Sequence, residues 1–233
     1  MANSGRSMYR KICDFFGSPL PEKLNTIELA YYRLKAVLYY RHVFASFGKG
    51  SVLYKPMMLT NPRFMHIGKN VVIRHGARME AIVTDAENLP ELRIGDNVNI
   101  EQNVHIVCHS NIVIGNDVSI TGNCAIVDVT HPFKDVHDPM KIGDRILKER
   151  SFLQIGDRSF LGFNVIVLPN VRIGRYCVVG AHALVSRDIP DYSVAAGNPA
   201  RILRRYDEAR EDWTSAATST ERNLANSDSL QRE

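Results

Sequence analysis

The sequence lacks the features that mark several common classes of protein. No apolar run approaches the length needed to cross a bilayer, and the N-terminus lacks the basic segment, apolar stretch and cleavage site of a signal peptide. The four cysteines stand far apart without a C-x-x-C pair, which argues against a zinc knuckle or a dithiol motif. The net charge is only +4, too small to indicate nucleic-acid binding. We therefore expect a cytoplasmic protein with free thiols and no nucleic-acid partner.

Apolar residues are plentiful, and charge is unevenly placed. Of the 233 residues, 45% are apolar, which is enough to bury a substantial core. Residues 207–233 hold seven acidic and three basic groups, so the rest of the chain carries +8 and could attract an anionic ligand. Residues 206–233 are also polar, and we expect them to form a flexible tail.

A repeat of six residues determines the expected fold. The dipeptide Ile-Gly recurs, and the interval between Ile155 and Ile173 is three steps of six. Apolar residues also stand at further intervals of six from these positions, and a small or β-branched residue lies four positions after most of them. Glycine and asparagine occur where the corners are expected. Six is not a multiple of the helical 3.6, whereas three short strands with a corner after each fit the pattern. The sequence predicts a triangular parallel β-helix whose anchors are Ile67, Ile94, Ile114, Ile155 and Ile173.

The tandem pattern [LIV]-G-x-x-[STAV]-x resembles the left-handed β-helix of the hexapeptide-repeat acyltransferases, over about residues 47–200. The resemblance implies an all-β fold, a left-handed parallel β-helix, over residues 47–205 with an inserted loop at 132–150. The same solenoid carries gamma-class carbonic anhydrases, nucleotidyltransferase appendages and non-catalytic scaffolds. Function must therefore be argued from a site.

Residues 1–46 precede the repeat as an N-terminal helical capping segment. Apolar residues at helical intervals predict a helix over 26–47, with Thr26 as its N-cap. We expect the helix to pack over the open first coil, because the end of a solenoid must be covered. Its basic, Tyr-rich character leaves a membrane-surface helix as an alternative that we do not predict.

Two interruptions of the repeat indicate a site. Two extra residues separate Ile106 from Ile114, and twenty-three separate Ile126 from Ile155. The second insertion is a long polar loop, where binding residues concentrate, and the outward-facing His131 lies at its root.

The run Asp-Val-Thr-His131-Pro resembles the segment around the catalytic histidine of the maltose/galactoside O-acetyltransferases. The resemblance implies that His131 is a general base that takes a sugar hydroxyl proton as the oxygen attacks a thioester. A covalent enzyme intermediate is not needed, and no G-x-S-x-G signature is present. Candidates for a carboxylate that orients the imidazole are Asp128, Asp135, Asp138 and Glu149.

The C-terminal repeats resemble the acetyl-CoA-binding end of these enzymes. Arginine suits phosphate oxygens because its planar fork donates two parallel hydrogen bonds, although a solvated basic end is the alternative for each arginine. At one position a phenylalanine stands where the family often has a small residue, and its backbone N–H can still donate to the thioester oxygen. The implied cofactor contacts are Phe163, Ala181, Ser186, Arg187, Arg201 and Arg204.

The acceptor positions depart from the family pattern. Where galactoside-type enzymes hold their acceptor with Asn and Asp, this chain has Glu101 and His109. We infer a different acceptor, with these two as candidate contacts and plain exposed positions as the alternative.

A zinc site of the gamma carbonic anhydrase type would need three histidines that converge on the metal. His105 and His131 differ in repeat phase from His109 and His182, so these side chains do not share one orientation and we expect no metal.

The family resemblance implies a homotrimeric acetyl-CoA-dependent O-acetyltransferase that acts on a saccharide hydroxyl in surface polysaccharide or lipopolysaccharide biosynthesis, and the saccharide class rests on that resemblance alone. In the family, His131 would face cofactor residues near Phe163 and Ala181 from the adjacent chain. N-acetylation of an amino sugar or nucleotide-linked amino sugar is the alternative activity. A non-catalytic solenoid scaffold is the alternative outside enzymes.

Overall fold

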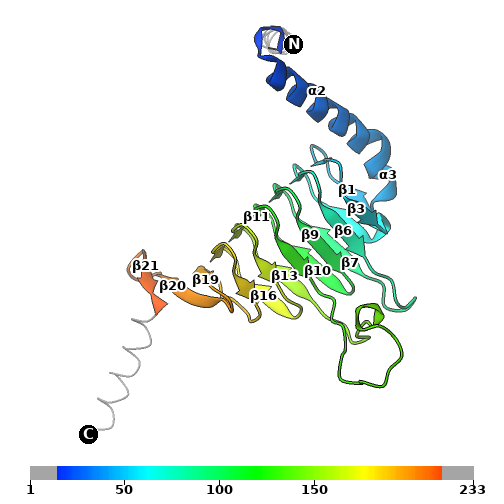
Figure 1. Cartoon of the computed structure of the whole chain (residues 1–233). Coiled ribbons are helices and arrows are strands. Elements are labelled where there is room, and N and C mark those ends of the chain that lie inside the picture. Colours follow the sequence, from blue (N-terminus) through cyan, green and yellow to red (C-terminus); the bar gives the residue numbers. More distant parts are fainter. Residues whose placement is uncertain (1–14, 217–233) are drawn as a thin grey trace.

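The computed structural model describes residues 15–216, in which a helical segment is followed by a stack of short strands (Figure 1). The strands form three sheets, here A, B and C, which β1 to β18 enter in that order, coil after coil. Sheet A contains β1 (Ser46–Phe47), β4 (Met65–Ile67), β7 (Glu91–Ile94), β10 (Asn111–Ile114), β13 (Leu153–Ile155) and β16 (Val171–Ile173). Sheet B contains β2 (Val52–Leu53), β5 (Val72–Ile73), β8 (Asn99–Ile100), β11 (Ser119–Ile120), β14 (Phe160–Leu161), β17 (Val178–Val179), β19 (Ser193–Ala196), β20 (Arg201–Asp207) and β21 (Asp212–Ser215). Sheet C contains β3 (Met58–Thr60), β6 (Arg78–Ala81), β9 (His105–Cys108), β12 (Ala125–Val127), β15 (Ile166–Val167) and β18 (Leu184–Val185).

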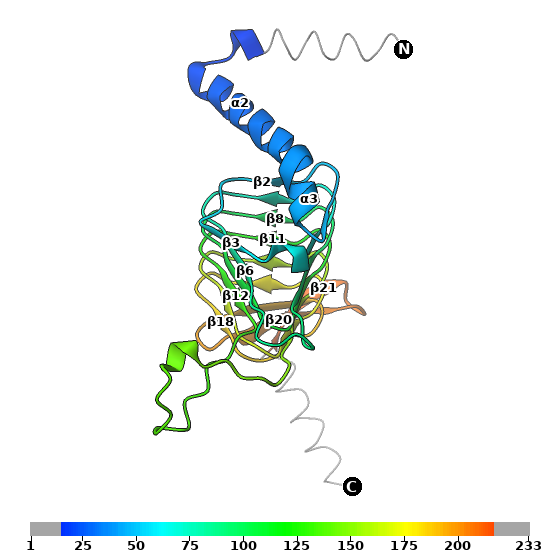
Figure 2. The same cartoon turned by 90° about the vertical axis from the view of Figure 1, so that its right-hand side faces the viewer.

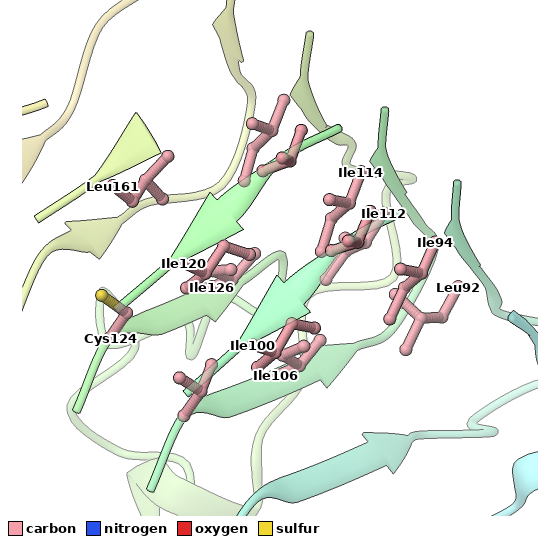
Figure 3. Packing of buried hydrophobic residues seen from close by; sticks show 14 of the residues in the cluster. Leu92, Ile94, Ile100, Ile106, Ile112, Ile114, Ile120, Cys124, Ile126 and Leu161 are labelled. Atoms are coloured by element: carbon pink, nitrogen blue, oxygen red, sulfur yellow. The ribbon is translucent and has the colours of Figure 1, made fainter. Parts of the chain in front are cut away.

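The predicted anchors of the repeat stack directly on one another in sheet A. Ile94 is paired in parallel with Ile67 on one side and Ile114 on the other, and Ile155 is paired with Ile114 and Ile173. All five anchors are at most 3% exposed. Figure 3 shows the same inward stacking for neighbouring apolar side chains from all three sheets. The six-residue period is therefore the period of the core, as predicted, and the chain is a parallel β-helix.

Asparagine, aspartate and glycine turn many of the corners, and arginine, tyrosine and histidine turn others. Asn70, Asn97 and Asn123 have φ values of 53°, 58° and 61°, the left-handed region that asparagine tolerates better than most residues. At the corner between sheets A and B the coils approach so closely that a Cβ on Gly68 would lie 2.4 Å from the carbonyl oxygen of Gly95. Glycine is therefore required there by contact between coils.

The corner between sheets C and A collects the insertions. A plain coil needs 18 residues, but the paired anchors Ile67 and Ile94 are 27 apart, Ile94 and Ile114 are 20 apart, and Ile114 and Ile155 are 41 apart. In each case the extra residues follow a strand of sheet C and precede a strand of sheet A. The second and third of these insertions are the two interruptions predicted from the sequence, and the first, residues 82–90, is an additional one. Figures 1 and 2 show the longest loop, which contains the short helix η3 (Ile142–Asp144), standing off from the coils.

The N-terminal helix begins earlier than predicted. It consists of α2 (Leu20–Lys35), the π-helical turn η1 (Ala36–Tyr40) and α3 (Arg41–Val43). Thr26 is not its N-cap: this residue lies inside α2, and its hydroxyl donates to the carbonyl of Glu22 at 2.9 Å. The C-terminal half of the segment covers the first coils: Tyr32 packs on Tyr54, and Tyr40 and Phe44 pack with Phe47 in the main core. The rest of α2 extends away from the solenoid (Figure 2).

The C-terminal end of the described chain is a hairpin. β20 pairs antiparallel with both β19 and β21, and Trp213 on β21 packs edge-on against Tyr206 at 5.6 Å. The expectation of a flexible tail is therefore wrong for residues 206–216, because two aromatic rings and a strand pairing hold them to sheet B. The remainder of that tail, and Cys13, lie outside the described residues.

Candidate functional site

A cavity of about 630 Å³ lies at the corner between sheets C and A. Its walls come from the three insertions: Thr84 and Asn88 from the first, His109 from the second, and Pro132 and Arg145 from the long loop. These segments are far apart in sequence, and the stacking of coils brings them together. Rigid coils with variable loops at one edge are a common way to build a binding site.

A buried carboxylate holds this corner in shape. Asp128 is 1% exposed, and its two oxygens accept the backbone N–H groups of three consecutive residues, His109, Ser110 and Asn111, the last two at 2.9 and 2.8 Å. Its own carbonyl accepts a hydrogen bond from the Ser151 hydroxyl at the return of the long loop. Asp128 therefore joins the second insertion to both the start and the return of the long loop. It lies three residues before His131 in the sequence.

His131 is exposed, and one ring nitrogen has a defined partner. Its Nδ1 lies 2.7 Å from the backbone carbonyl of Arg145. A carbonyl can only accept, so Nδ1 carries the proton and, in the neutral ring, Nε2 is an unprotonated acceptor. Within residues 15–216 no hydrogen-bond partner occupies Nε2. His131 therefore presents a proton-accepting nitrogen. Its own side chain does not line the cavity, but the next residue, Pro132, and its hydrogen-bond partner Arg145 both do.

Arg145 organises the loop that supplies this carbonyl. Its guanidinium donates to the carbonyls of Met140, Asp135 and Asp138 at 2.8, 2.8 and 2.7 Å, and it also pairs with the Asp138 carboxylate at 3.3 Å. The Arg145 side chain is only 10% exposed, so these contacts are largely shielded from water. The expectation that a carboxylate orients His131 is wrong. The orienting group is a main-chain carbonyl, and Arg145 fixes the turn that places it.

The two acceptor candidates lie at opposite ends of β9. His109 follows β9, lines the cavity and is 6% exposed, with its Nε2 2.8 Å from the hydroxyl of Thr84 and its Nδ1 3.3 Å from that of Ser110. The alternative of a plain exposed position is therefore wrong for His109. Glu101 precedes β9 at the corner between sheets B and C, half-buried and 3.8 Å from Arg74. The structure thus brings His109, but not Glu101, to the cavity beside His131.

The corner between sheets B and C carries Phe163 and Ala181 on successive coils. Both are exposed, and the Phe163 ring packs edge-on against His182 at 5.9 Å. In the described chain no side chain accepts the backbone N–H of either residue. The corner between sheets A and B differs, because there the N–H groups of Lys69 and Asn116 are accepted by an aspartate of the next coil at 2.7 Å. The B–C edge therefore offers free amides to a ligand.

The remaining cofactor candidates divide between two edges. Arg201 begins β20 opposite Ala196, and Ala196 lies against Gly180, so Arg201 is near Ala181. Arg204 lies further along β20, paired with Val194, and both arginines are exposed. Ser186 and Arg187 are exposed at the C–A corner, just after β18. Within one chain the six predicted residues do not form a single cluster.

His131 and the Phe163 corner lie at opposite edges of sheet C. Gly122 lies at one edge, where a Cβ on it would be 3.5 Å from the Phe163 ring, and Asp128 lies at the other edge, six residues along the same coil. An extended strand rises about 3.3 Å per residue, so the two edges are about 20 Å apart. One chain alone does not place the proton acceptor beside the free amides.

The described residues contain neither a metal-binding cluster nor a membrane-spanning helix. Residues 15–216 contain no group of three or more His, Cys, Asp or Glu side chains arranged to hold a metal ion. In the same range, no helix has the length and hydrophobicity to span a bilayer.

Comparison with known proteins agrees with the geometry of the coils. A family model described as "Bacterial transferase hexapeptide (six repeats)" matches residues 153–187. The chain is 33% identical over 165 residues to the "Putative lipopolysaccharide biosynthesis O-acetyl transferase WbbJ" of Escherichia coli K12, a match that covers 69% of this chain and 82% of that protein. It is 36% identical over 118 residues to the galactoside O-acetyltransferase of Lactococcus lactis, which covers 51% of this chain and 55% of that one.

A solved structure shows the same fold at lower identity. AntD, an N-acyltransferase from Bacillus cereus in complex with dTDP and 3-hydroxybutyryl-CoA, superposes with a TM-score of 0.59 at 18% identity, over 80% of this chain and 93% of that one. At this identity the likeness concerns the fold alone. The six-residue stacking, the matched repeat model and the similarity to WbbJ over most of its length together show that the chain belongs to the hexapeptide-repeat acyltransferases.

Proposed function

We propose that this protein is an acetyl-CoA-dependent O-acetyltransferase that acts on a saccharide hydroxyl, in surface polysaccharide or lipopolysaccharide biosynthesis in the cytoplasm. The proposal includes the left-handed coil that the family resemblance implies. The observation that carries it is the hydrogen bond from His131 Nδ1 to the Arg145 carbonyl, which leaves Nε2 as a base at the edge of a polar cavity. Names of relatives such as galactoside O-acetyltransferase support the acceptor class.

The residues define roles in direct transfer. Acetyl-CoA supplies the acyl group as a thioester. His131 Nε2 accepts the proton of the acceptor hydroxyl while that oxygen forms a bond to the acyl carbon, and the protonated ring then gives the proton to the departing sulfur. The Phe163 N–H donates to the developing oxyanion, and the cavity with Thr84 and His109 holds the sugar.

The separation of the two edges supports a homotrimer. Since His131 and Phe163 lie about 20 Å apart across sheet C, the proton acceptor of one chain would meet the amides of its neighbour. A closed threefold arrangement gives three such grooves. Subunits with His131→Ala, mixed with subunits carrying Ala181→Trp, should then recover part of the lost activity. A fully active monomer would contradict shared sites.

The central test is mass spectrometry of a glycan panel incubated with acetyl-CoA. We expect His131→Ala to fold normally, since the residue is exposed, and to lose about 10²–10⁴-fold in turnover. His137→Ala is the matched control, because His137 is an exposed histidine of the same loop. Wild-type turnover by His131→Ala would exclude the general-base role. Products acetylated only on amines would instead favour N-acetylation.

A further inference from the structure

The N-terminal helix carries an uncovered apolar stripe with a regular spacing. Its six members follow one another at intervals of four, three, four, three and four residues. All six are more than half exposed, with fractions between 55% and 68%. The stripe, here the α2 stripe, consists of Leu20, Leu24, Ile27, Tyr31 and Leu34 on α2, and Leu38 on the π-helical turn η1 that follows.

The α2 stripe is not the surface that joins the helix to the solenoid. That contact uses other positions: Tyr32 packs on Tyr54 with ring centroids 4.9 Å apart, and Glu28 meets the His75 ring nitrogen at 2.9 Å. Ala36 and Tyr40 continue the contact into the core of the first coil. Helix α2 therefore has two apolar faces, of which one is docked and one is exposed in the described structure.

The spacing identifies the type of surface. Alternating intervals of four and three average 3.5 residues, the repeat that keeps a narrow seam facing another helix in a coiled coil. In heptad notation Leu20, Ile27 and Leu34 are d positions, and Leu24, Tyr31 and Leu38 are a positions. Exposed apolar residues scattered singly would need no explanation, but six in one seam do.

The surface of the stripe has the shape that such a partner requires. A shallow cavity of about 480 Å³ is lined by Leu24, Ile27, Glu28 and Tyr31, together with Asn25 and Tyr32. The first four are consecutive a, d, e and a positions, and a coiled-coil knob inserts into a hole formed by four residues of the facing helix. Ile27 of a second copy, a d residue in a parallel pair, has the position to enter it.

Charge favours a second copy of this chain in parallel orientation. Lys23 occupies a g position and Glu28 the e position five residues later, the pair that faces across a parallel coiled coil. The Glu28 carboxylate meets His75 through Oε1, which leaves Oε2 for Lys23 of the second copy. Parallel orientation is also the one available if solenoids stand side by side with their first coils at the same end, because α2 leaves each solenoid beyond its first coil (Figure 2). The flanking charges are thus self-complementary in the arrangement that the fold permits.

We propose that the α2 helices of neighbouring copies of this protein pair in parallel through the α2 stripe. The pairing is independent of the acetyl-transfer chemistry, since the stripe lies on the helix that extends beyond the first coil. It adds an interface at the N-terminal end of the assembly to any contact between solenoid faces.

Site-directed cross-linking tests the pairing in the full-length chain. In a Cys13→Ser background, Ile27→Cys places a thiol in the seam, and Thr26→Cys places one on the exposed outer side of the same turn. With a short bismaleimide we expect about tenfold more covalent dimer from Ile27→Cys than from Thr26→Cys at equal protein concentration. Equal cross-linking at the two positions, or none at either, would overturn the proposal.

A second experiment separates a protein partner from a lipid surface. Ile27→Glu leaves the solenoid untouched, so circular dichroism should be unchanged, and it should abolish cross-linking when combined with Leu34→Cys. Flotation with phosphatidylglycerol vesicles should be the same for wild type and Ile27→Glu. Vesicle binding that Ile27→Glu abolishes, without cross-linking in the seam, would overturn the pairing in favour of a membrane-surface role.

Discussion

Replacing Asp128 by asparagine tests whether one buried carboxylate holds the C–A corner together. The side chain is 1% exposed and accepts three consecutive backbone N–H groups, with one oxygen serving Ser110 and Asn111 and the other serving His109. Asparagine keeps one oxygen, which can accept the N–H groups of Ser110 and Asn111, and it turns its NH₂ group toward the N–H of His109. The His109 N–H then has no acceptor, and the other two bonds lose their charge assistance.

The magnitude follows from these contacts. An unsatisfied buried donor costs about 1–3 kcal/mol, and a hydrogen bond to a charged group contributes about 1.5–3 kcal/mol against about 1 kcal/mol for a neutral one. Relief of the desolvation of a buried carboxylate offsets part of this loss, because no cation pairs with Asp128 in the described chain. We expect a net destabilisation of about 2–4 kcal/mol, or a fall in Tm of about 5–15 °C for a chain of this length.

Thermal unfolding by circular dichroism, at fixed protein concentration, measures this change. Asp157→Asn is the matched control: it makes the same chemical change at an exposed aspartate that accepts the N–H of Asn116 at 2.7 Å. Asp128→Asn should also lower kcat/KM for the acceptor at least about tenfold, with the KM for acetyl-CoA retained, because only the His131 corner is disturbed. A fall in Tm no larger than that of Asp157→Asn would refute the anchoring role.

Three other changes test separate parts of the molecule. Arg145→Ala should open residues 132–150 to limited proteolysis and lower turnover about 10²-fold, since the carbonyl that holds His131 is released. Lys134→Ala, at an exposed cation of the same loop that does not line the cavity, should do neither, and a protease-resistant Arg145 variant would contradict its role. Arg201→Ala and Arg204→Ala should raise the KM for acetyl-CoA about 10–100-fold through lost phosphate contacts, and unchanged CoA affinity by calorimetry would count against them. Burial raises the pKa of the thiols of Cys108, Cys124 and Cys177, so iodoacetamide at pH 8 should modify them only after denaturation. Rapid labelling of the native protein would argue against their burial.

The repeat could be predicted from sequence because the same six-residue rule applies at every coil. Ile94 and Ile155 are buried because each is the inward-facing anchor of its coil, so a correct prediction at one coil supports the prediction at the next. The helix start was missed because Thr26 offers a cap in isolation, whereas Pro21 in the first turn marks the true beginning. Residues 206–216 look polar, but the hairpin depends on Trp213 meeting Tyr206, a contact that composition does not reveal.

The site was only partly predictable for a different reason. His131 lies where the six-residue repeat is interrupted, and that interruption is visible in the sequence. The carbonyl that it contacts belongs to Arg145, fourteen residues away, and this contact depends on how the loop folds. Asp128 is one of the four unranked carboxylates that the sequence offers as partners for His131, yet its oxygens turn inward to backbone amides at the start of the coil. The insertion at residues 82–90 had a visible signal in the interval of 27 from Ile67 to Ile94.

The placement of the insertions at one corner explains how such a scaffold can change the acceptor in our proposal. Lengthening a flexible loop from 9 to 23 residues adds only about 0.8 kcal/mol of closure entropy, since that entropy grows with the logarithm of length. A similar insertion within a strand would break ladders with both neighbouring coils, and at the A–B corner it would break the chain of amide-to-aspartate bonds that includes Asn116 and Asp157. The C–A corner is therefore where length varies at little cost to the core. A cavity whose walls all come from such loops can be reshaped for a new sugar, while the B–C edge that faces acetyl-CoA in our proposal keeps its free amides.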